Sequence, residues 1–274
     1  MLSVGSQLPE YRIRAFNSAT DSNNLIHDDN YARRYGYRGG LVPGVSIYAY
    51  MSRSLVELLG REWLERGSAA VRFDRPTYEG EEVRVSGKLA SIAEDGTLTI
   101  EFQAANAVGL VCAGGTAGLT RAPAAPGPKL KDYPAGHGKL GRPIALESLK
   151  VGERLTPVTS EFSWNVNWEY CQKTVRDHHP IYNQIAHPGW LLTQANSVFA
   201  ANYELPPWIH VSSVVQNYRL QELEGLVETR GCVREKFERK GHHFVVLDLA
   251  IFAGKECLAT IGHTAIFHIA PRAA

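Results

Sequence analysis

The chain carries one long pattern twice, and this internal repeat limits its possible folds more than any other feature. Residues 41–60 and 186–203 each hold a Pro-Gly pair near their start and continue with apolar residues at helical spacing. Proline suits the first turn of a helix, because its missing N–H would have had no partner there. Both segments are apolar on more than one side, which predicts two helices that a sheet covers.

Strand-like sequence follows each predicted helix. In residues 69–119 and again in residues 211–269, runs of alternating apolar and polar residues are separated by glycine-containing turns. Each half therefore predicts one long buried helix followed by an antiparallel meander, an α+β unit that occurs twice. We expect the two units to pair edge to edge in one sheet, because that pairing covers two strand edges.

A segment of different composition separates the two units. Residues 121–143 are rich in proline, glycine and lysine, which predicts a linker that runs extended rather than packing. The predicted organisation is an N-terminal unit in residues 1–120, this linker, and a C-terminal unit in residues 144–274.

Composition excludes several classes of protein. Of the 274 residues, 44% are hydrophobic and 21% charged, which is typical of a globular chain. The formal net charge of +1 gives no general attraction to nucleic acid or anionic membranes. The sequence has no apolar run long enough to span a membrane and no signal-peptide pattern. Its four cysteines form no CxxC pair, so we expect reduced thiols and a cytoplasmic protein.

The residue types that could carry chemistry gather before the first helix, in residues 22–44, a polar and glycine-rich segment. His27 can give or take a proton near neutral pH. Asn24 can hold a carbonyl or a water by hydrogen bonds. A helix that begins at Gly44 offers backbone N–H groups to an oxygen that gains negative charge during a reaction.

Residues 22–27, Ser-Asn-Asn-Leu-Ile-His, resemble the Asp-x-Asn-Pro-Leu-His motif of MaoC-like, or R-specific, enoyl-CoA hydratases and acyl dehydratases. Ala32, Gly36 and the Pro43-Gly44 helix start follow at spacing similar to that of the family. The resemblance implies a double hot-dog fold and reversible hydration of 2-enoyl thioesters on CoA or a carrier protein. It also implies a homodimer that needs no cofactor and takes the acyl thioester as its substrate.

The same resemblance assigns roles to individual residues. It implies that His27 moves the proton, that Asn24 places the water, and that the Gly44 N–H binds the thioester carbonyl. Beside them, we expect Val42, Tyr48 and Arg38 to bind substrate. Tyr48 would wall an acyl tunnel along the helices together with Trp190 and Phe199, and Arg38 would contact the phosphates of CoA.

The sequence departs from the motif at its acid, because Ser22 stands where the family has Asp. A one-residue bulge could bring Asp21 into that place, or Asp28 or Asp29 could orient His27. A hydroxyl does not take up a proton at pH 7 as a carboxylate does. We therefore keep Asp21 and Ser22 as candidate catalytic residues. Two alternatives stay open: a hot-dog thioesterase, and a non-catalytic module that binds acyl thioesters or hydrophobic ligands.

A second, incomplete copy of the motif occupies residues 177–182, with an acid at Asp177 and Tyr182 at the histidine position. We place the site near His27, whose flanking segment is longer and richer in glycine. A composite site built from both motif copies is not expected, since the two copies should lie at opposite ends of the sheet.

The remaining histidines give weaker signals. Their spacing matches no tight ligand pattern, so we expect no metal site at His178, His179, His187 or His210. The basic turn at residues 239–243 is expected to be solvated, or else to contact nucleotide phosphates.

Overall fold

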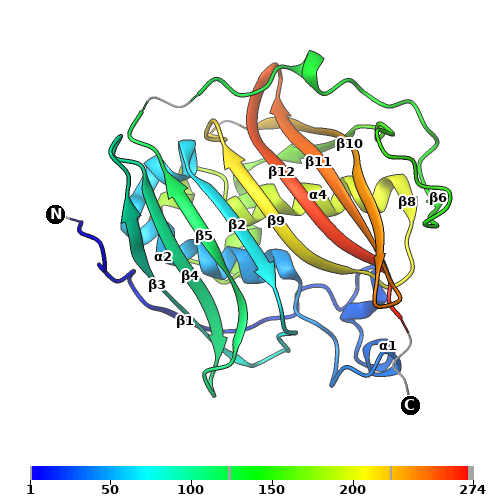
Figure 1. Cartoon of the computed structure of the whole chain (residues 1–274), viewed down its shortest axis with the longest axis horizontal. Coiled ribbons are helices and arrows are strands. Elements are labelled where there is room, and N and C mark those ends of the chain that lie inside the picture. The colour runs from blue at the N-terminus through cyan, green and yellow to red at the C-terminus, as the bar shows by residue number, and fades with distance from the viewer. Residues whose placement is uncertain (1, 123–124, 223, 271–274) are drawn as a thin grey trace.

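The computed structural model describes residues 2–122, 125–222 and 224–270, and its main feature is one ten-stranded antiparallel sheet (Figure 1). The strands lie in the order β1-β3-β4-β5-β2-β9-β12-β11-β10-β7. From each edge of the sheet to its centre, the corresponding strands of the two halves follow in the same order. The first half supplies β1 (Tyr11–Arg14), β2 (Ser68–Phe73), β3 (Glu82–Ile92), β4 (Leu98–Asn106) and β5 (Val111–Leu119). The second half supplies β7 (Val158–Phe162), β9 (Ile209–Asn217), β10 (Gly225–Arg239), β11 (His242–Ala253) and β12 (Glu256–His268).

The two halves join through β2 and β9, which pair antiparallel from Ser68 opposite Gln216 to Arg72 opposite Ser212. This junction confirms the expected edge-to-edge pairing. It also brings residues that lie more than a hundred positions apart in sequence to the centre of the sheet.

Two long helices pack on the same side of the sheet, behind it in the view of Figure 1. They are α2 (Gly44–Arg66) and α4 (Pro188–Asn202), and both begin near the Pro-Gly pairs of the sequence. The backbone of α2 is interrupted at Gly60, whose φ of 62° leaves the helical region. Both helices bury most of their side chains, so the α+β prediction of two sheet-covered helices is confirmed.

The segments before the two helices contain short elements. In the first half these are η1 (Leu25–His27) and α1 (Asp29–Arg34). In the second half they are α3 (Trp164–Glu169), the π-helical turn η3 (Tyr170–Thr174) and η4 (Pro180–Asn183). The first of these segments crosses to the other half: Ile26, Ala32 and Leu41 pack with Ile269, against Ile209 and Ile266 of β9 and β12.

The composition of the linker predicts an extended segment that does not pack, but part of the linker packs on the second half. Its turn η2 (Leu130–Asp132) and the following Tyr133 pack on the buried residues Ala250, Phe252 and Cys257 of the second half. The Tyr133 hydroxyl also donates a hydrogen bond to Asp248 at 3.0 Å. Farther along, β6 (Arg142–Pro143) pairs with β8 (Tyr203–Glu204) in a small parallel sheet. In the ranges given above, no helix is long and apolar enough to cross a membrane.

Candidate active site

A cavity of about 520 Å³ lies where the two halves meet. The first half lines it with residues from the segment before α2, the start of that helix and the loop after β2. The second half lines it with the first residues of β9, the β10–β11 hairpin and parts of β12. Residues 24–44 reach across to the second half at this cavity, whereas no residue of the second motif copy, 177–182, lines it.

Asn24 is anchored to the second half by a pair of hydrogen bonds. Its Nδ2 donates to the carbonyl oxygen of Trp208 at 3.0 Å, and the Trp208 N–H donates to its Oδ1 at 3.1 Å. Asn24 thereby pairs with the chain just before β9 as a neighbouring strand would. The remaining N–H of this amide points toward Nε2 of His27, at 3.3 Å.

The imidazole of His27 is held by one short hydrogen bond. Its Nδ1 lies 2.6 Å from the carbonyl oxygen of Leu41. A carbonyl can only accept, so Nδ1 carries the proton and Nε2 keeps its lone pair. Burial lowers the pKa of His27, and the hydrogen bond to Leu41 offsets part of this effect. His27 is thus a neutral imidazole at pH 7 with a basic nitrogen at the cavity.

The carboxylates near His27 accept hydrogen bonds from backbone N–H groups and not from the imidazole. Asp28 caps α1 by accepting from the Tyr31 N–H at 2.9 Å. Asp29 accepts from the Gly40 N–H at 2.8 Å and pairs with Arg33. No carboxylate in the described part of the chain forms a hydrogen bond with His27, so the expectation that Asp28 or Asp29 orients it is wrong.

The start of α2 forms the next wall of the cavity. Pro43 precedes the helix without a side-chain cap, and the Gly44 N–H has no hydrogen-bond partner among the residues that the structure describes. A Cβ on residue 44 would lie 3.0 Å from Nδ1 of His210, so a larger residue would require the imidazole or the helix start to move by a few tenths of an ångström. A free N–H at a helix N-terminus is suited to bind an oxygen that carries partial negative charge.

His210 comes from β9 and was not expected at the site. It lines the cavity, is only 6% exposed, and its Nε2 lies 2.8 Å from the hydroxyl of Ser213. The same hydroxyl lies 3.5 Å from Nδ1 of His263, whose ring is fully buried. Burial lowers the pKa of His263 to about 3, and burial together with His263 lowers that of His210. Only the β2–β9 junction brings His210 to Gly44, so no local motif could have indicated it.

Some of the residues predicted for the site line the cavity, and others lie away from it. Val42 and Gly44 line the cavity together with Asn24 and His27. The remaining four do not reach it, for separate reasons. The side chains of Asp21 and Ser22 are exposed, Tyr48 is 1% exposed within the core, and Arg38 pairs with Glu81 and lies over the ring of Tyr78.

The prediction that Trp190 and Phe199 wall an acyl tunnel is wrong for this cavity. Trp190 and Phe199 are core residues, at 6% and 0% exposure, and neither lines the cavity. Phe199 packs edge-on against Trp208, which leaves Trp208 as the aromatic side chain between this core and the cavity.

The second motif copy is closed by internal hydrogen bonds. Asp177 is 2% exposed; its Oδ1 lies 2.7 Å from Nη1 of Arg53 and its Oδ2 lies 3.4 Å from Nε2 of His187. Nδ1 of His187 accepts from the Gly189 N–H at 3.0 Å, so the start of α4 is capped where that of α2 is free. Tyr182 stands at the motif-histidine position in the sequence, but the histidine that contacts Asp177 is His187.

Comparison with known proteins now adds to this geometry. No protein-family model and no curated protein sequence matches the chain. Among solved structures, a MaoC-like dehydratase matches with a TM-score of 0.63 and 18% identity, covering 96% of this chain and 98% of that one. RV0216 from Mycobacterium tuberculosis, described as having a double hot-dog fold, matches with a TM-score of 0.63 and 11% identity, covering 97% of this chain and 96% of that one. The fold is a double hot-dog.

Proteins described by different activities share this double hot-dog fold. A Lactobacillus plantarum protein described as an oleoyl thioesterase matches with a TM-score of 0.53 and 13% identity, covering 97% of each chain. At such identities the likeness establishes the fold, and the activity has to be argued from the site.

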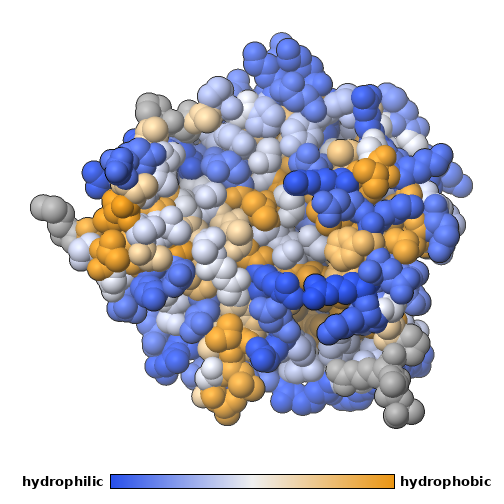
Figure 2. Space-filling model, viewed as in Figure 1, coloured by the Kyte–Doolittle hydropathy of each residue, from blue (hydrophilic) through white to orange (hydrophobic). Residues whose placement is uncertain are grey.

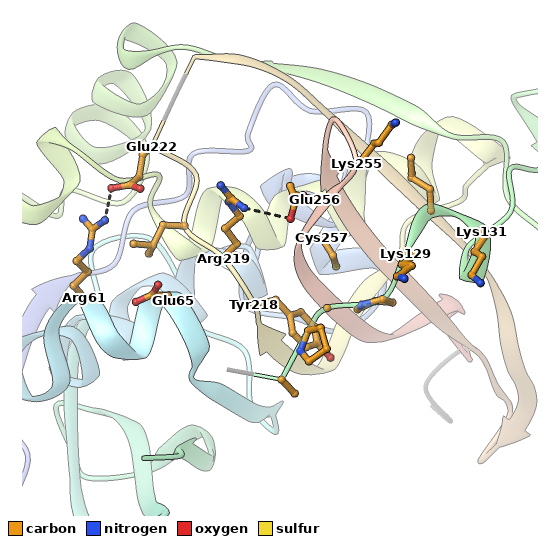
Figure 3. A pocket seen from close by; sticks show the side chains of 16 residues that line it. Arg61, Glu65, Lys129, Lys131, Tyr218, Arg219, Glu222, Lys255, Glu256 and Cys257 are labelled. Atoms are coloured by element: carbon orange, nitrogen blue, oxygen red, sulfur yellow. Dashed lines mark hydrogen bonds and ion pairs between the residues drawn. The ribbon is translucent and has the colours of Figure 1, made fainter. Parts of the chain in front are cut away.

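The double hot-dog has a second cavity, of about 850 Å³, between the linker, the C-terminal half of α2 and the β11–β12 turn (Figure 3). Two of its arginines are paired with carboxylates, Arg61 with Glu222 and Arg219 with Glu256. Among the described residues its lining holds no histidine, and its other titratable side chains are those of Glu65, Lys129, Lys131, Tyr218, Lys255 and Cys257. Chemistry is therefore better supported in the cavity of His27. Nowhere in the described ranges do three His, Cys, Asp or Glu side chains cluster as metal ligands.

Proposed function

We propose that this chain is a hydro-lyase that interconverts 2-enoyl and 3-hydroxyacyl thioesters carried by CoA or a carrier protein. The observation that supports it best is the pairing of two groups in one cavity. They are the neutral His27, with its lone pair on Nε2, and the uncapped Gly44 N–H. The first can move a proton, and the second can bind a carbonyl oxygen that becomes negative.

In the hydration direction, the thioester carbonyl accepts a hydrogen bond from Gly44 N–H. Nε2 of His27 takes a proton from a water as the water oxygen bonds to C3 of the substrate. The electron pair of the C2–C3 double bond moves to form an enolate, whose oxygen remains at Gly44. His27 then returns its proton to C2, which gives the 3-hydroxyacyl thioester and the neutral imidazole. Dehydration reverses each step.

Asn24 would position the water in this scheme. Its Nδ2 contact to His27 is 3.3 Å, which is long for a hydrogen bond, so a water can take its place at Nε2. The two hydrogen bonds to the backbone of Trp208 hold the Asn24 amide in place. The Leu41 carbonyl fixes the orientation and the tautomer of neutral His27, so no carboxylate is needed for that purpose.

A second candidate function has an observation in its favour. His27 has no carboxylate partner within the described ranges, and Asp21 and Ser22 lie outside the cavity. A site that lacks one proton-transfer group is what a non-catalytic acyl-thioester binding module would retain.

One experiment separates these functions. The protein is incubated with 2-enoyl-CoA thioesters of increasing chain length, while the enoyl absorbance, free thiol and bound ligand are followed. Loss of enoyl absorbance without thiol release supports the hydro-lyase. Thiol release instead indicates a thioesterase, and saturable binding without either change indicates the binding module. Both of these results would contradict the proposal.

A further inference from the structure

The tip of the β10–β11 hairpin presents an aromatic and cationic face to the cavity mouth. Phe237 lies opposite Phe244 and Arg239 opposite His242 in the strand register, and all four line the cavity. The two phenyl rings are stacked, with centroids 4.7 Å apart and an angle of 9° between their planes. Phe237 is 36% exposed, which is high for so large an apolar side chain.

Side-chain alternation removes the acidic residue from this face. Successive residues of a strand point to opposite faces, so Glu238 points away from Phe237 and Arg239. Glu238 instead lies 3.8 Å from His243, and neither of these two residues lines the cavity.

More cations stand on the opposite side of the mouth. Arg72 at the end of β2 and Arg75 in the following loop line the cavity, as do Arg239 and Lys240 of the hairpin. Among the described residues of the lining, Asp74 is the single carboxylate, and it pairs with Arg72 at 2.6 Å. Arg239 and Lys240 are exposed and have no ion-pair partner among the described residues.

This concentration of charge is local. The whole chain has a formal net charge of +1, whereas the cavity lining holds four arginine or lysine side chains against one carboxylate. The space-filling view shows hydrophilic side chains around a recessed hydrophobic surface toward its lower right (Figure 2). A polyanion with an apolar arm fits such a mouth, because its phosphates can remain outside while the arm enters.

We infer that the hairpin face formed by Phe237, Arg239, Lys240 and Phe244 binds the phosphorylated adenosine of CoA, with Arg72 and Arg75 opposite. The adenine stacks on Phe237, and the phosphates accept hydrogen bonds from the cations. The inference rests on the proposed thioester substrate and chooses its carrier. A carrier protein delivers the same arm with one phosphate and no adenine, and so would leave the exposed Phe237 unused.

The test measures binding and turnover separately. Binding of adenosine 3′,5′-bisphosphate and of CoA is measured by calorimetry for the unaltered protein, Phe237→Ala, Arg239→Ala and Arg234→Ala. Arg234 is an exposed cation of the same strand outside the cavity, so Arg234→Ala is the matched control. Turnover of an enoyl-CoA is compared with that of the corresponding enoyl-pantetheine and enoyl-carrier protein.

We expect Phe237→Ala to weaken CoA binding about 10-fold, the size of one lost base–aromatic stack. We expect Arg239→Ala to weaken it by about the same factor, with a smaller salt dependence, and Arg234→Ala to have no effect. In the unaltered protein, kcat/KM should be at least about 10-fold higher for the CoA thioester than for the pantetheine thioester, and Phe237→Ala should reduce this ratio.

The inference fails if both hairpin variants bind CoA as tightly as Arg234→Ala does, or if the carrier-protein thioester is the preferred substrate. Its failure is separate from that of the proposed function. If CoA binds through the hairpin but no enoyl thioester is hydrated, the nucleotide site stands and the hydro-lyase proposal falls.

Discussion

Nδ1 of His27 lies 2.6 Å from the carbonyl oxygen of Leu41, and this contact decides which ring nitrogen is free. Because the carbonyl can only accept, the proton stays on Nδ1 and the lone pair stays on Nε2, at the cavity. A carboxylate usually orients a histidine that transfers protons, but here a main-chain oxygen in the glycine-rich loop does so. The Gly40 position makes this possible, since a Cβ there would lie 2.0 Å from the His27 carbonyl oxygen.

The first prediction concerns the pH dependence of hydration. Protonation of His27 removes the base, and burial lowers its pKa, so the loss of activity is moved to lower pH. We expect the acid limb of kcat/KM to be centred below about 6.5, the ordinary histidine value. The measurement is a pH profile of enoyl-thioester hydration. An acid limb centred above the ordinary histidine pKa would contradict this assignment.

The second prediction concerns the start of α2. Gly44→Ala places a methyl group 3.0 Å from Nδ1 of His210, so the ring or the helix start must move. We expect kcat/KM to fall by up to roughly 10²-fold, because a displaced helix start no longer aligns its N–H with the developing oxyanion. Gly114→Ala is the matched control, because its Cβ meets nothing closer than 3.7 Å. Gly44→Ala keeps the N–H, so equal kinetics for both variants would contradict the expectation that the added methyl group displaces this N–H from the developing oxyanion.

The third prediction concerns the closed second motif. Burial alone would raise the pKa of Asp177, but His187, the His179 N–H and Arg53 outweigh it and lower the pKa to about 2. A lowered carboxyl pKa stabilises the fold above the unfolded value, and this stabilisation is lost as the pH falls toward the folded value. We therefore expect Asp177→Asn to lower the free energy of unfolding by about 2 kcal/mol at pH 7.

That difference should shrink with acid, by about 1 kcal/mol between pH 6 and pH 3. Urea unfolding of both proteins across this range measures it, and groups that do not contact Asp177 cancel in the comparison. A difference that is independent of pH would show that Asp177 contributes through packing and not through its charge.

The fold could be predicted from the sequence because its signals are local. Helix spacing, strand alternation and glycine-containing turns recur in both halves, and the Pro-Gly pairs mark both helix starts within a few residues. The edge strands β1 and β7 could not be predicted, since four and five residues with half-exposed alternation give little signal. The predicted homodimer stays a prediction.

The site could be predicted only in part. Asn24, His27, Val42 and Gly44 lie within one continuous segment, and all four line the cavity. His210 and the β10–β11 hairpin reach the same cavity through the pairing of β2 with β9, a contact that no periodicity within either half indicates. The acids nearest to His27 in sequence do not contact it. Asp21 is exposed to solvent, and Asp28 and Asp29 accept hydrogen bonds from backbone N–H groups.

The most direct test of the account is the hydration rate of His27→Gln beside that of His243→Gln. Glutamine keeps polar groups in place of His27 but cannot take up the proton, whereas His243 lies on the hairpin face away from the cavity. We predict that His27→Gln lowers kcat by about 10²- to 10⁴-fold, the contribution of a general base, and that His243→Gln leaves it unchanged. Equal rates for the two variants would contradict the assignment of His27 as the proton-transfer residue.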